Sequence, residues 1–215
     1  MTTFGVLFDL DGVLVDSETT YTRFWKEIDE IYPTGIHDFA VAIKGTTLPS
    51  ILEYFPDDAV REDIKQRLTE FQGKMRFPFY PGAEQLLKEL KELGIPTAIV
   101  TSSDKSKMEL LFAQHPQLKE LVTAVIDASH VTRSKPDPQG YMLGAQAIGV
   151  VPQHCFVFED SLQGLAAGRA AGATVVGIAT TYPVTRISPL ADIVIDSISH
   201  INVATLIDKA STFRP

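Results

Sequence analysis

The chain has 215 residues, of which 45% are hydrophobic and 21% charged, and it carries a formal net charge of −8 at pH 7. This length supports one well-filled core with a smaller appended unit, and the composition is that of a globular protein. The acidic balance argues against DNA, RNA and anionic membranes as partners, because binding them requires clustered lysine and arginine. A small phosphorylated metabolite stays compatible with it, since one metal ion and one or two local cations can neutralise a phosphate.

The single cysteine, Cys155, excludes a disulfide within the chain and any cysteine-rich zinc site. It lies in an apolar run, which favours a buried structural thiol. The N-terminal residues lead into an apolar run without the basic stretch of a signal segment, and the apolar runs are too short to span a bilayer. We therefore expect a cytoplasmic protein. The sequence leaves the oligomeric state open, and a monomer is plausible.

Six short apolar runs rich in β-branched residues are predicted as strands. They read as nearly continuous hydrophobic stretches, which is typical of parallel strands that are covered on both faces. In chain order they are residues 4–8, 97–100, 122–126, 155–158, 174–178 and 193–195.

Residues 16–79 separate the first strand from the second, contain no convincing strand and have turn signals at 32–35 and 56–58. The stretch begins directly after the first strand, where open α/β sheets bind their ligands. We therefore expect a helical cap over residues 16–79 and a catalytic core made of residues 1–15 and 80–215. The alternative is a set of extra core helices packed flat against the sheet.

Segments of helical period separate the later strands. In residues 82–93 the leucines fall on one face, Gly94 ends the helix and Pro96 prevents it from resuming. The same reasoning predicts helices over residues 140–148, 161–171 and 200–210. This alternation of strand and helix predicts an α/β fold with a doubly wound parallel sheet.

Polar side chains gather after several predicted strands. They are Asp9 and Asp11 after the first strand, Thr101, Ser102 and Ser103 after the second, and Glu159, Asp160 and Ser161 after the fourth. Lys135 lies just ahead of a predicted helix. Because parallel strands end at one edge of their sheet, we expect these groups to converge in a crevice. So many acids need a cation among them, and oxygen ligands without histidine or cysteine suit Mg²⁺.

Each of these patterns is common by itself, but their order and their positions after the correct strands make a chance arrangement improbable. Residues 8–18 resemble the first motif of the haloacid dehalogenase superfamily, and residues 101–103, 134–136 and 158–161 resemble its second, third and fourth motifs. The resemblance covers nearly the whole chain. The helical insertion is similar to the cap of the branch that includes β-phosphoglucomutase and phosphoglycolate phosphatase.

The resemblance implies a Rossmann-like core and a Mg²⁺-dependent phosphatase that works through an aspartyl-phosphate. Asp9 would attack phosphorus, and Asp11 would protonate the departing alkoxide and then take a proton from water. The implied metal ligands are Asp9, the backbone carbonyl of Asp11, Glu159 and Asp160. The implied phosphate-binding residues are Thr101, Ser102 and Lys135. Dehalogenation would need neither Asp11 nor the metal-binding pair Glu159-Asp160, so phosphoryl chemistry is favoured.

Substrate choice is expected to lie in the insertion. Lys44, Thr46 and Thr47 belong to a stretch similar to the substrate loop of the β-phosphoglucomutase branch, although a solvated lysine before a turn is an equal alternative. Tyr21 stands where mutase-like sequences have histidine, and Leu48 where the mutase has the arginine that holds a distal phosphate. Tyr21 and Trp25 are interpreted as packing aromatics.

Hydrolysis of a small sugar or polyol phosphate is therefore the preferred function. The alternatives are a β-phosphoglucomutase-like mutase, a pyrophosphatase or nucleotide phosphatase, and a non-catalytic binding protein on the same fold.

Overall fold

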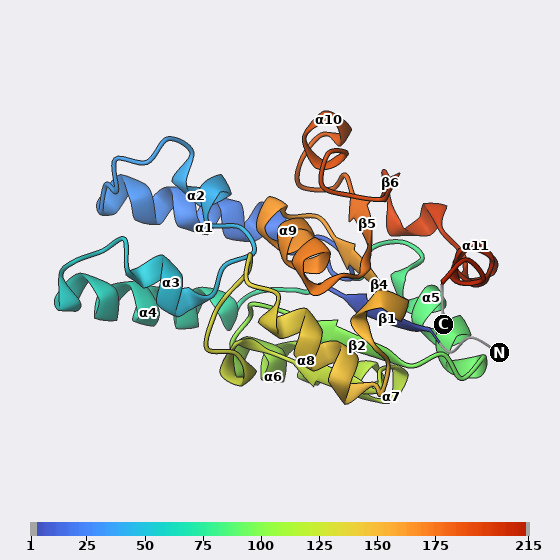
Figure 1. Cartoon of the computed structure of the whole chain (residues 1–215). Helices are drawn as coiled ribbons and strands as arrows, with labels where there is room; N and C mark the ends of the chain where they lie inside the picture. The colour runs from blue at the N-terminus through green and yellow to red at the C-terminus, as the bar shows by residue number, and fades with distance from the viewer. Residues whose placement is uncertain (1–3, 214–215) are drawn as a thin grey trace.

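A six-stranded parallel sheet forms the centre of the computed structural model, which describes residues 4–213 (Figure 1). The strands are β1 (Gly5–Phe8), β2 (Thr97–Val100), β3 (Ala124–Ile126), β4 (Cys155–Glu159), β5 (Thr174–Ile178) and β6 (Ile193–Ile195). Their spatial order is β3-β2-β1-β4-β5-β6, and all neighbouring pairs are parallel. The predicted doubly wound α/β fold is confirmed. The winding reverses between β1 and β4, which is where such sheets bind their ligands.

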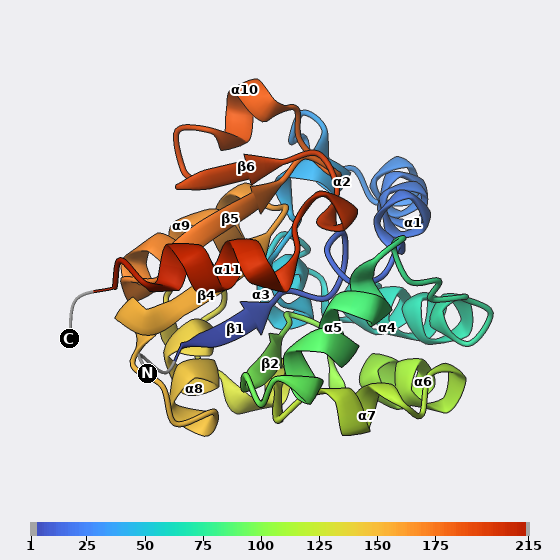
Figure 2. The same ribbon diagram turned by 90° about the vertical axis from the view of Figure 1, so that its right-hand side faces the viewer.

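Helices cover both faces of the sheet, which explains the uninterrupted apolar strands. Val6 and Phe8 of β1 belong to one buried cluster, and Leu7 between them belongs to a second cluster on the other face. The first cluster includes α5 (Ala83–Glu92) and α11 (Val203–Ala210), which lie side by side in Figure 2. The second includes α8 (Gln139–Ala147) and α9 (Leu162–Ala171). Successive side chains of a strand point to opposite faces, so one strand supplies both clusters.

The predicted elements agree with the structure within two residues, apart from the start of the last helix. There the residues 198–200 form a separate 3-10 turn before α11 begins at Val203. Three helices were not predicted: α6 (Lys105–Gln114), α7 (Leu118–Leu121) and α10 (Val184–Ile187). In α6 the buried residues are Lys107, Met108 and Leu111, and other apolar residues of the helix stay partly exposed. Its sequence therefore lacks the apolar stripe that reveals an amphipathic helix.

The insertion consists of α1 (Glu18–Ile31), α2 (Phe39–Ala42), α3 (Leu48–Leu52) and α4 (Asp58–Gln72), which lie at the end of the molecule away from the termini in Figure 1. These helices share a buried cluster of their own that includes Trp25, Phe39 and Ile64. The segments entering and leaving the insertion run side by side, because Val15 pairs antiparallel with Phe79 and further backbone hydrogen bonds flank this pair.

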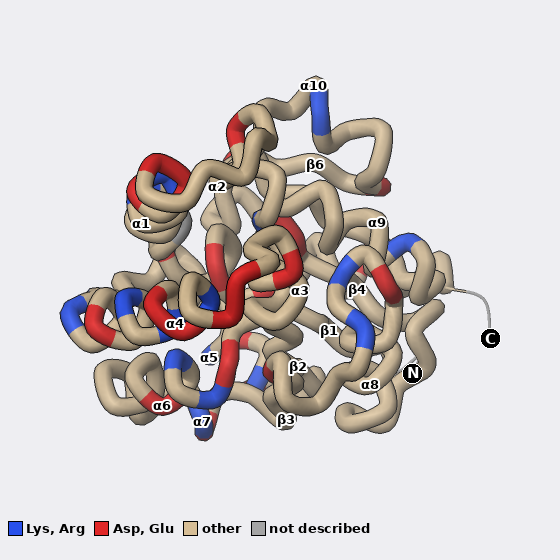
Figure 3. Tube along the Cα trace, turned by 90° about the vertical axis from the view of Figure 1, so that its left-hand side faces the viewer, with Lys and Arg blue, Asp and Glu red and all other residues tan. Residues whose placement is uncertain are grey.

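The outer face of α4 carries acidic and basic residues in alternation (Figure 3). They form ion pairs one turn apart along the helix: Arg61 with Asp58, Lys65 with Glu62, and Arg67 with Asp63. Such pairs contribute only weakly to the stability of an exposed helix, because solvent screens the charges. Among the described residues, none of the helices combines the length and apolar character that crossing a membrane requires.

Candidate functional site

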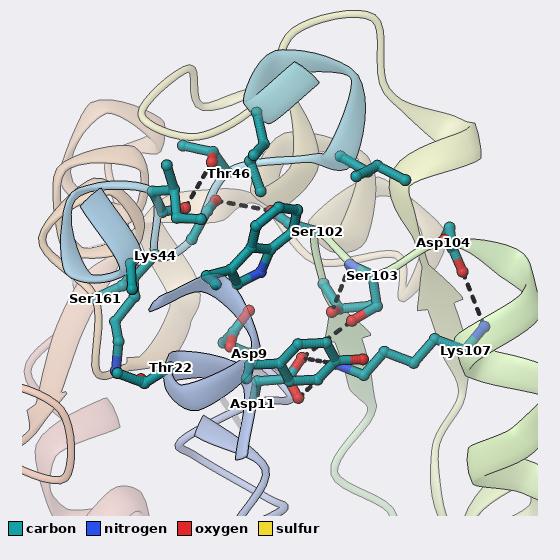
Figure 4. Close-up of a pocket in the computed structure, with 18 of the residues that line it drawn as sticks. Asp9, Asp11, Thr22, Lys44, Thr46, Ser102, Ser103, Asp104, Lys107 and Ser161 are labelled. Atoms are coloured by element: carbon teal, nitrogen blue, oxygen red, sulfur yellow. Dashed lines mark hydrogen bonds and ion pairs between the residues drawn. The ribbon is translucent and has the colours of Figure 1, made fainter. Parts of the chain in front are cut away.

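A pocket lies at the carboxyl edge of the sheet, between the strand ends and the helical insertion (Figure 4). Its sheet side is lined by Asp9, Asp11, Thr101, Ser102, Ser103, Asp104, Lys107, Asp160 and Ser161. Most of these residues belong to three segments that are far apart in sequence and that follow β1, β2 and β4. The structure therefore brings the strand-end side chains together, as the sequence predicts.

The turn after β1 brings the two aspartates to β4. The carbonyl of Leu10 accepts the backbone N–H groups of Leu14 and Val15, at 2.9 and 3.0 Å, so the chain folds back immediately. Gly12 has φ +79°, and a Cβ at this position would lie 2.0 Å from Asp160 Oδ2. Only glycine permits both this left-handed backbone conformation and the close contact with the Asp160 carboxylate.

Asp9 is a buried acid among other acids. Its side chain accepts a hydrogen bond of 2.5 Å from Lys135 Nζ. Burial raises the pKa of Asp9 to about 8; Lys135 opposes this increase, and the nearby charges of Glu159 and Asp11 add to it. The site therefore contains more negative charge than its own cations balance.

Lys135 supplies a fixed positive charge behind Asp9. Its ammonium donates to Asp9 Oδ1 and Glu159 Oε1, both at 2.5 Å, and to the Val100 carbonyl at 3.3 Å. Burial alone would lower the pKa of Lys135, but the charges of Asp9 and Glu159 raise it above its usual range. Because an ammonium has three protons, these three acceptors define its position.

Glu159 is fully buried, and donors surround both of its oxygens. Oε2 accepts from the backbone N–H groups of Asp160 and Ser161 and from Ser161 Oγ, each at 3.0 Å. Oε1 accepts from Lys135 and, at 2.7 Å, from Tyr141 Oη. Glu159 thus orders the loop after β4 and the Lys135 ammonium, and its predicted role as a metal ligand stays a prediction.

Carboxylate oxygens of Asp9, Glu159 and Asp160 lie within 4.8 Å of one another, and all three residues are buried. Thr181 Oγ1 donates to Asp160 and orients its carboxylate. An all-oxygen donor set with surplus negative charge suits a hard divalent cation such as Mg²⁺. Since the oxygens of Glu159 are surrounded by protein donors, Asp9 and Asp160 are the carboxylates best placed to bind it.

Asp11 is held by three donor side chains, one from the turn after β1 and two from the segment after β2. Lys107 Nζ lies 2.6 and 2.5 Å from its two oxygens, Ser103 Oγ donates at 3.0 Å, and Ser17 Oγ donates as well. Burial disfavours the charged form, but the charge of Lys107 and the three donors hold the pKa of Asp11 below its usual value. These contacts therefore favour the carboxylate form of Asp11 in the site without substrate.

Sequence reasoning missed Lys107, Ser17, Tyr141 and Thr181. Ser17 lies inside the first motif, so its proximity to Asp11 could have been inferred. Lys107 lies on the unpredicted α6, one turn after the strand-end hydroxyls; a lysine in that first turn was the available signal. Tyr141 and Thr181 come from elements whose side-chain directions the sequence does not reveal.

The predicted phosphate-binding hydroxyls have different neighbours. Thr101 is buried and lines the pocket, and its Oγ1 accepts from the backbone N–H of Ser103 at 3.1 Å. Ser102 Oγ instead donates to the backbone carbonyl of Gly45 in the insertion, at 2.8 Å. Ser102 therefore joins the strand end to the insertion through its side chain.

Two of the three predicted insertion residues reach the pocket. Lys44 and Thr46 line it, and in Figure 4 the Lys44 side chain points toward Thr22. Thr47 is not among the described residues that line this pocket, and its contact with the substrate stays a prediction. It is buried at the start of α3, with Oγ1 3.3 Å from Ser50 Oγ, because its position before the helix turns the side chain inward.

The aromatic residues of α1 have a larger role than packing. Trp25 packs edge-on against Phe24 and Phe39, as expected, but Trp25, Tyr21 and Leu48 also line the pocket. The Tyr21 ring lies 4.2 Å from Lys107 Nζ. The interpretation of Tyr21 and Trp25 as packing residues alone was therefore incomplete.

Comparison with known proteins gives a consistent family. The family model described as haloacid dehalogenase-like hydrolase matches residues 5–172. Hexitol phosphatase A of Escherichia coli is 34% identical over 93% of this chain and 93% of its own length. The fructose-1-phosphate phosphatase YqaB of the same organism is 30% identical over 81% of this chain and 95% of its own length.

Solved structures resemble this fold closely. A β-phosphoglucomutase from Clostridium difficile has a TM-score of 0.80 with 22% identity and covers 97% of each chain. A haloacid dehalogenase family hydrolase from Deinococcus radiodurans, crystallised with bound phosphate and sodium, has a TM-score of 0.72 with 28% identity. The alignment with it covers 100% of this chain and 99% of the other.

Proposed function

The chain belongs to the haloacid dehalogenase-like hydrolases and is a phosphohydrolase, and from this we propose that it hydrolyses a small sugar or polyol phosphate with Mg²⁺. One observation supports the proposal above all others: Asp9 and Asp11 lie together at the reversal of the winding, each in contact with its own buried lysine. A nucleophile beside an acid–base group is what two-step phosphoryl transfer requires.

In the first step, an oxygen of Asp9 forms a bond to phosphorus while the bond to the substrate's alkoxide oxygen breaks. Lys135 and Thr101 are placed beside Asp9 to contact oxygens of the transferring phosphoryl group. Charge fixed in advance at such positions stabilises the transition state without reorganisation. Asp11 enters this step in its protonated form, gives its proton to the departing alkoxide and becomes a carboxylate.

In the second step, a water molecule attacks the aspartyl-phosphate, and Asp11 accepts a proton from that water. The donors around Asp11 favour its carboxylate, which is the form that accepts this proton. Phosphate is released and Asp9 is regenerated. General acid–base catalysis of this kind typically accelerates a reaction by roughly 10²–10⁴-fold.

Asp9, Asp160 and the backbone carbonyl of Asp11 are the groups that would hold Mg²⁺, with Glu159 ordering the loop beneath them. When bound, the ion supplies positive charge to the phosphoryl group and to the crowded carboxylates. This charge also offsets the burial and repulsion that raise the pKa of Asp9 and would otherwise leave it protonated.

We further propose that residues 16–79 act as the cap that selects the substrate. Lys44 and Thr46 offer polar contacts, while Tyr21, Trp25 and Leu48 give the same wall an apolar part. Leu48 supplies no charge for a second phosphate, which favours hydrolysis over a mutase reaction. The similarity to hexitol and fructose-1-phosphate phosphatases supports a sugar or polyol phosphate. A cytoplasmic location belongs to the same proposal.

A panel of phosphate esters tests this function. We expect phosphate release in Mg²⁺ from hexitol and ketose phosphates, and a loss of at least about 100-fold after chelation, because a metal ion contributes several kcal/mol of transition-state stabilisation. Adding Mg²⁺ back should restore the rate. Isomerisation of a hexose 1-phosphate without free phosphate would contradict hydrolysis, and unchanged activity after exhaustive chelation would contradict the metal.

Gly45 provides a test of contact between the insertion and the sheet. Its φ is +80°, and a Cβ there would lie 2.5 Å from Ser161 Oγ. Gly45→Ala should lower kcat/KM about tenfold or more, because the added Cβ forces the Gly45 loop and Ser161 apart at the pocket, and small misplacements of site residues cost roughly 10²-fold in rate.

Gly35→Ala is the matched control, because Gly35 has φ +72° but no atom within 4 Å of an added Cβ. It should share the loss of stability that a left-handed alanine causes, measured by thermal unfolding, while keeping the wild-type kcat/KM. Equal activities of the two variants would show that the close approach of Gly45 to Ser161 is unimportant for turnover.

A further inference from the structure

A buried lysine other than the one that contacts Asp9 lines the pocket. Lys107 is only 4% exposed, and its ammonium contacts both oxygens of Asp11, at 2.5 and 2.6 Å. Removing a lysine from water is costly unless an opposite charge compensates for it. Asp11 therefore compensates for the buried charge of Lys107.

The backbone of α6 places Lys107 firmly. Asp104 caps this helix, and its side chain accepts the backbone N–H of Lys107 at 2.8 Å. The side chain extends from the first turn of α6 toward Asp11, as Figure 4 shows. Together with Ser103 and Ser17, Lys107 gives the two oxygens of the Asp11 carboxylate three donor side chains.

The insertion in turn contacts Lys107. The ring of Tyr21 on α1 lies 4.2 Å from Lys107 Nζ, a distance at which a cation is attracted to the face of an aromatic ring. Gln72 at the end of α4 donates to Tyr21 Oη at 3.1 Å. A continuous series of contacts therefore runs from α4 through Tyr21 and Lys107 to Asp11.

We propose that Lys107 is a positioning residue that holds the Asp11 carboxyl toward the leaving-group oxygen, and that Tyr21 makes this placement depend on the insertion. The inference rests on the proposed function, because it assigns Lys107 a role in the step where Asp11 protonates the alkoxide. The competing role is a purely structural ion pair that stabilises the fold and affects all substrates alike.

The leaving group distinguishes the two roles. An alkyl phosphate such as glycerol phosphate needs a proton on its departing oxygen, whereas p-nitrophenyl phosphate releases a stabilised phenolate that does not. We would compare kcat/KM, which reports on the first chemical step, for both esters in the wild type and in Lys107→Met. Lys105→Met is the matched control, since Lys105 is an exposed lysine on the same helix.

Lys107→Met should reduce kcat/KM for glycerol phosphate at least about tenfold more than for p-nitrophenyl phosphate, in keeping with the usual contribution of a general acid. Lys107→Arg should recover most of this difference, because a guanidinium can contact both oxygens of a carboxylate. Lys105→Met should match the wild type with both esters. A difference between the esters of less than tenfold in Lys107→Met would overturn the proposal.

Tyr21 provides a second test that leaves Lys107 in place, in case Lys107→Met does not fold. Tyr21→Leu removes the ring above the ammonium, whereas Tyr21→Phe keeps it. The selective loss of the alkyl ester should appear in Tyr21→Leu and be smaller in Tyr21→Phe, and identical ester ratios in both variants would refute the link to the insertion. Absence of phosphate release by the wild type from every ester would instead refute the proposed function itself.

Discussion

Asp9→Asn should abolish phosphate release, lowering kcat by on the order of 10⁴-fold or more, as expected when a covalent nucleophile is removed. The amide has the shape of the carboxylate but cannot form the acyl phosphate. Asp9 lies at the end of β1, where the backbone N–H donates to the Phe158 carbonyl at 2.9 Å, so the substitution leaves the surrounding strands paired. Phosphate release assays with the best substrate of the panel measure the loss.

Mass spectrometry adds a direct readout for Asp9. In acid-quenched wild-type enzyme we expect one phosphoryl group on the peptide that contains Asp9, and none on that peptide in Asp9→Asn. Asp16→Asn is a matched control, because Asp16 is an exposed carboxylate a few residues further along the same segment. If Asp9→Asn kept wild-type turnover, another residue would have to be the nucleophile.

Lys135→Met should be the most destabilising single substitution at the site. Removing this ammonium leaves Asp9 and Glu159 buried without the cation that lies 2.5 Å from each. Breaking a buried ion pair in this way typically costs about 3–5 kcal/mol. We expect a correspondingly large drop in the free energy of unfolding, measured with denaturant, and loss of activity from the purified protein.

A double-mutant cycle measures how much the ion pair between Lys135 and Glu159 contributes to the free energy of unfolding, apart from the packing of the two side chains. Glu159→Gln removes the negative charge and retains one oxygen, which can accept either from Tyr141 or from the backbone N–H groups of Asp160 and Ser161. The double variant Lys135→Met/Glu159→Gln should lose less stability than the sum of the two single variants, because residues in direct contact couple by roughly 0.5–3 kcal/mol. Lys209→Met, an exposed control, should be nearly neutral. Strict additivity would mean that the two charges do not stabilise each other.

The sheet and its acidic edge could be predicted from sequence, because parallel topology fixes where the residues after each strand lie. Once residues 5–8 and 155–159 form neighbouring parallel strands, the side chains that follow them must lie at one edge. Asp9 and Asp160 are therefore placed together by the backbone alone. Their proximity needs no knowledge of how the helices pack.

The parts that escaped prediction depend on side-chain direction in tertiary structure. Thr46 and Thr47 are adjacent, yet only Thr46 lines the pocket, because Thr47 turns inward where α3 begins. In the sequence, nothing distinguishes Lys107 from the other polar residues of a helix that lacks an apolar stripe. Its role becomes visible only when α6 lies beside the turn after β1. Glu159 matched a metal-ligand pattern, but the five donors around its oxygens come from backbone and side chains that the pattern does not contain.

The paired segments at Val15 and Phe79 have a consequence for how this chain can change over evolution. They bring the two ends of the insertion together, and the insertion packs a buried cluster of its own side chains. Under the proposed role of the insertion, substitutions there change the side of the pocket that selects the substrate while β1 keeps Asp9 in place. Substrate preference and phosphoryl chemistry would then evolve as separable traits.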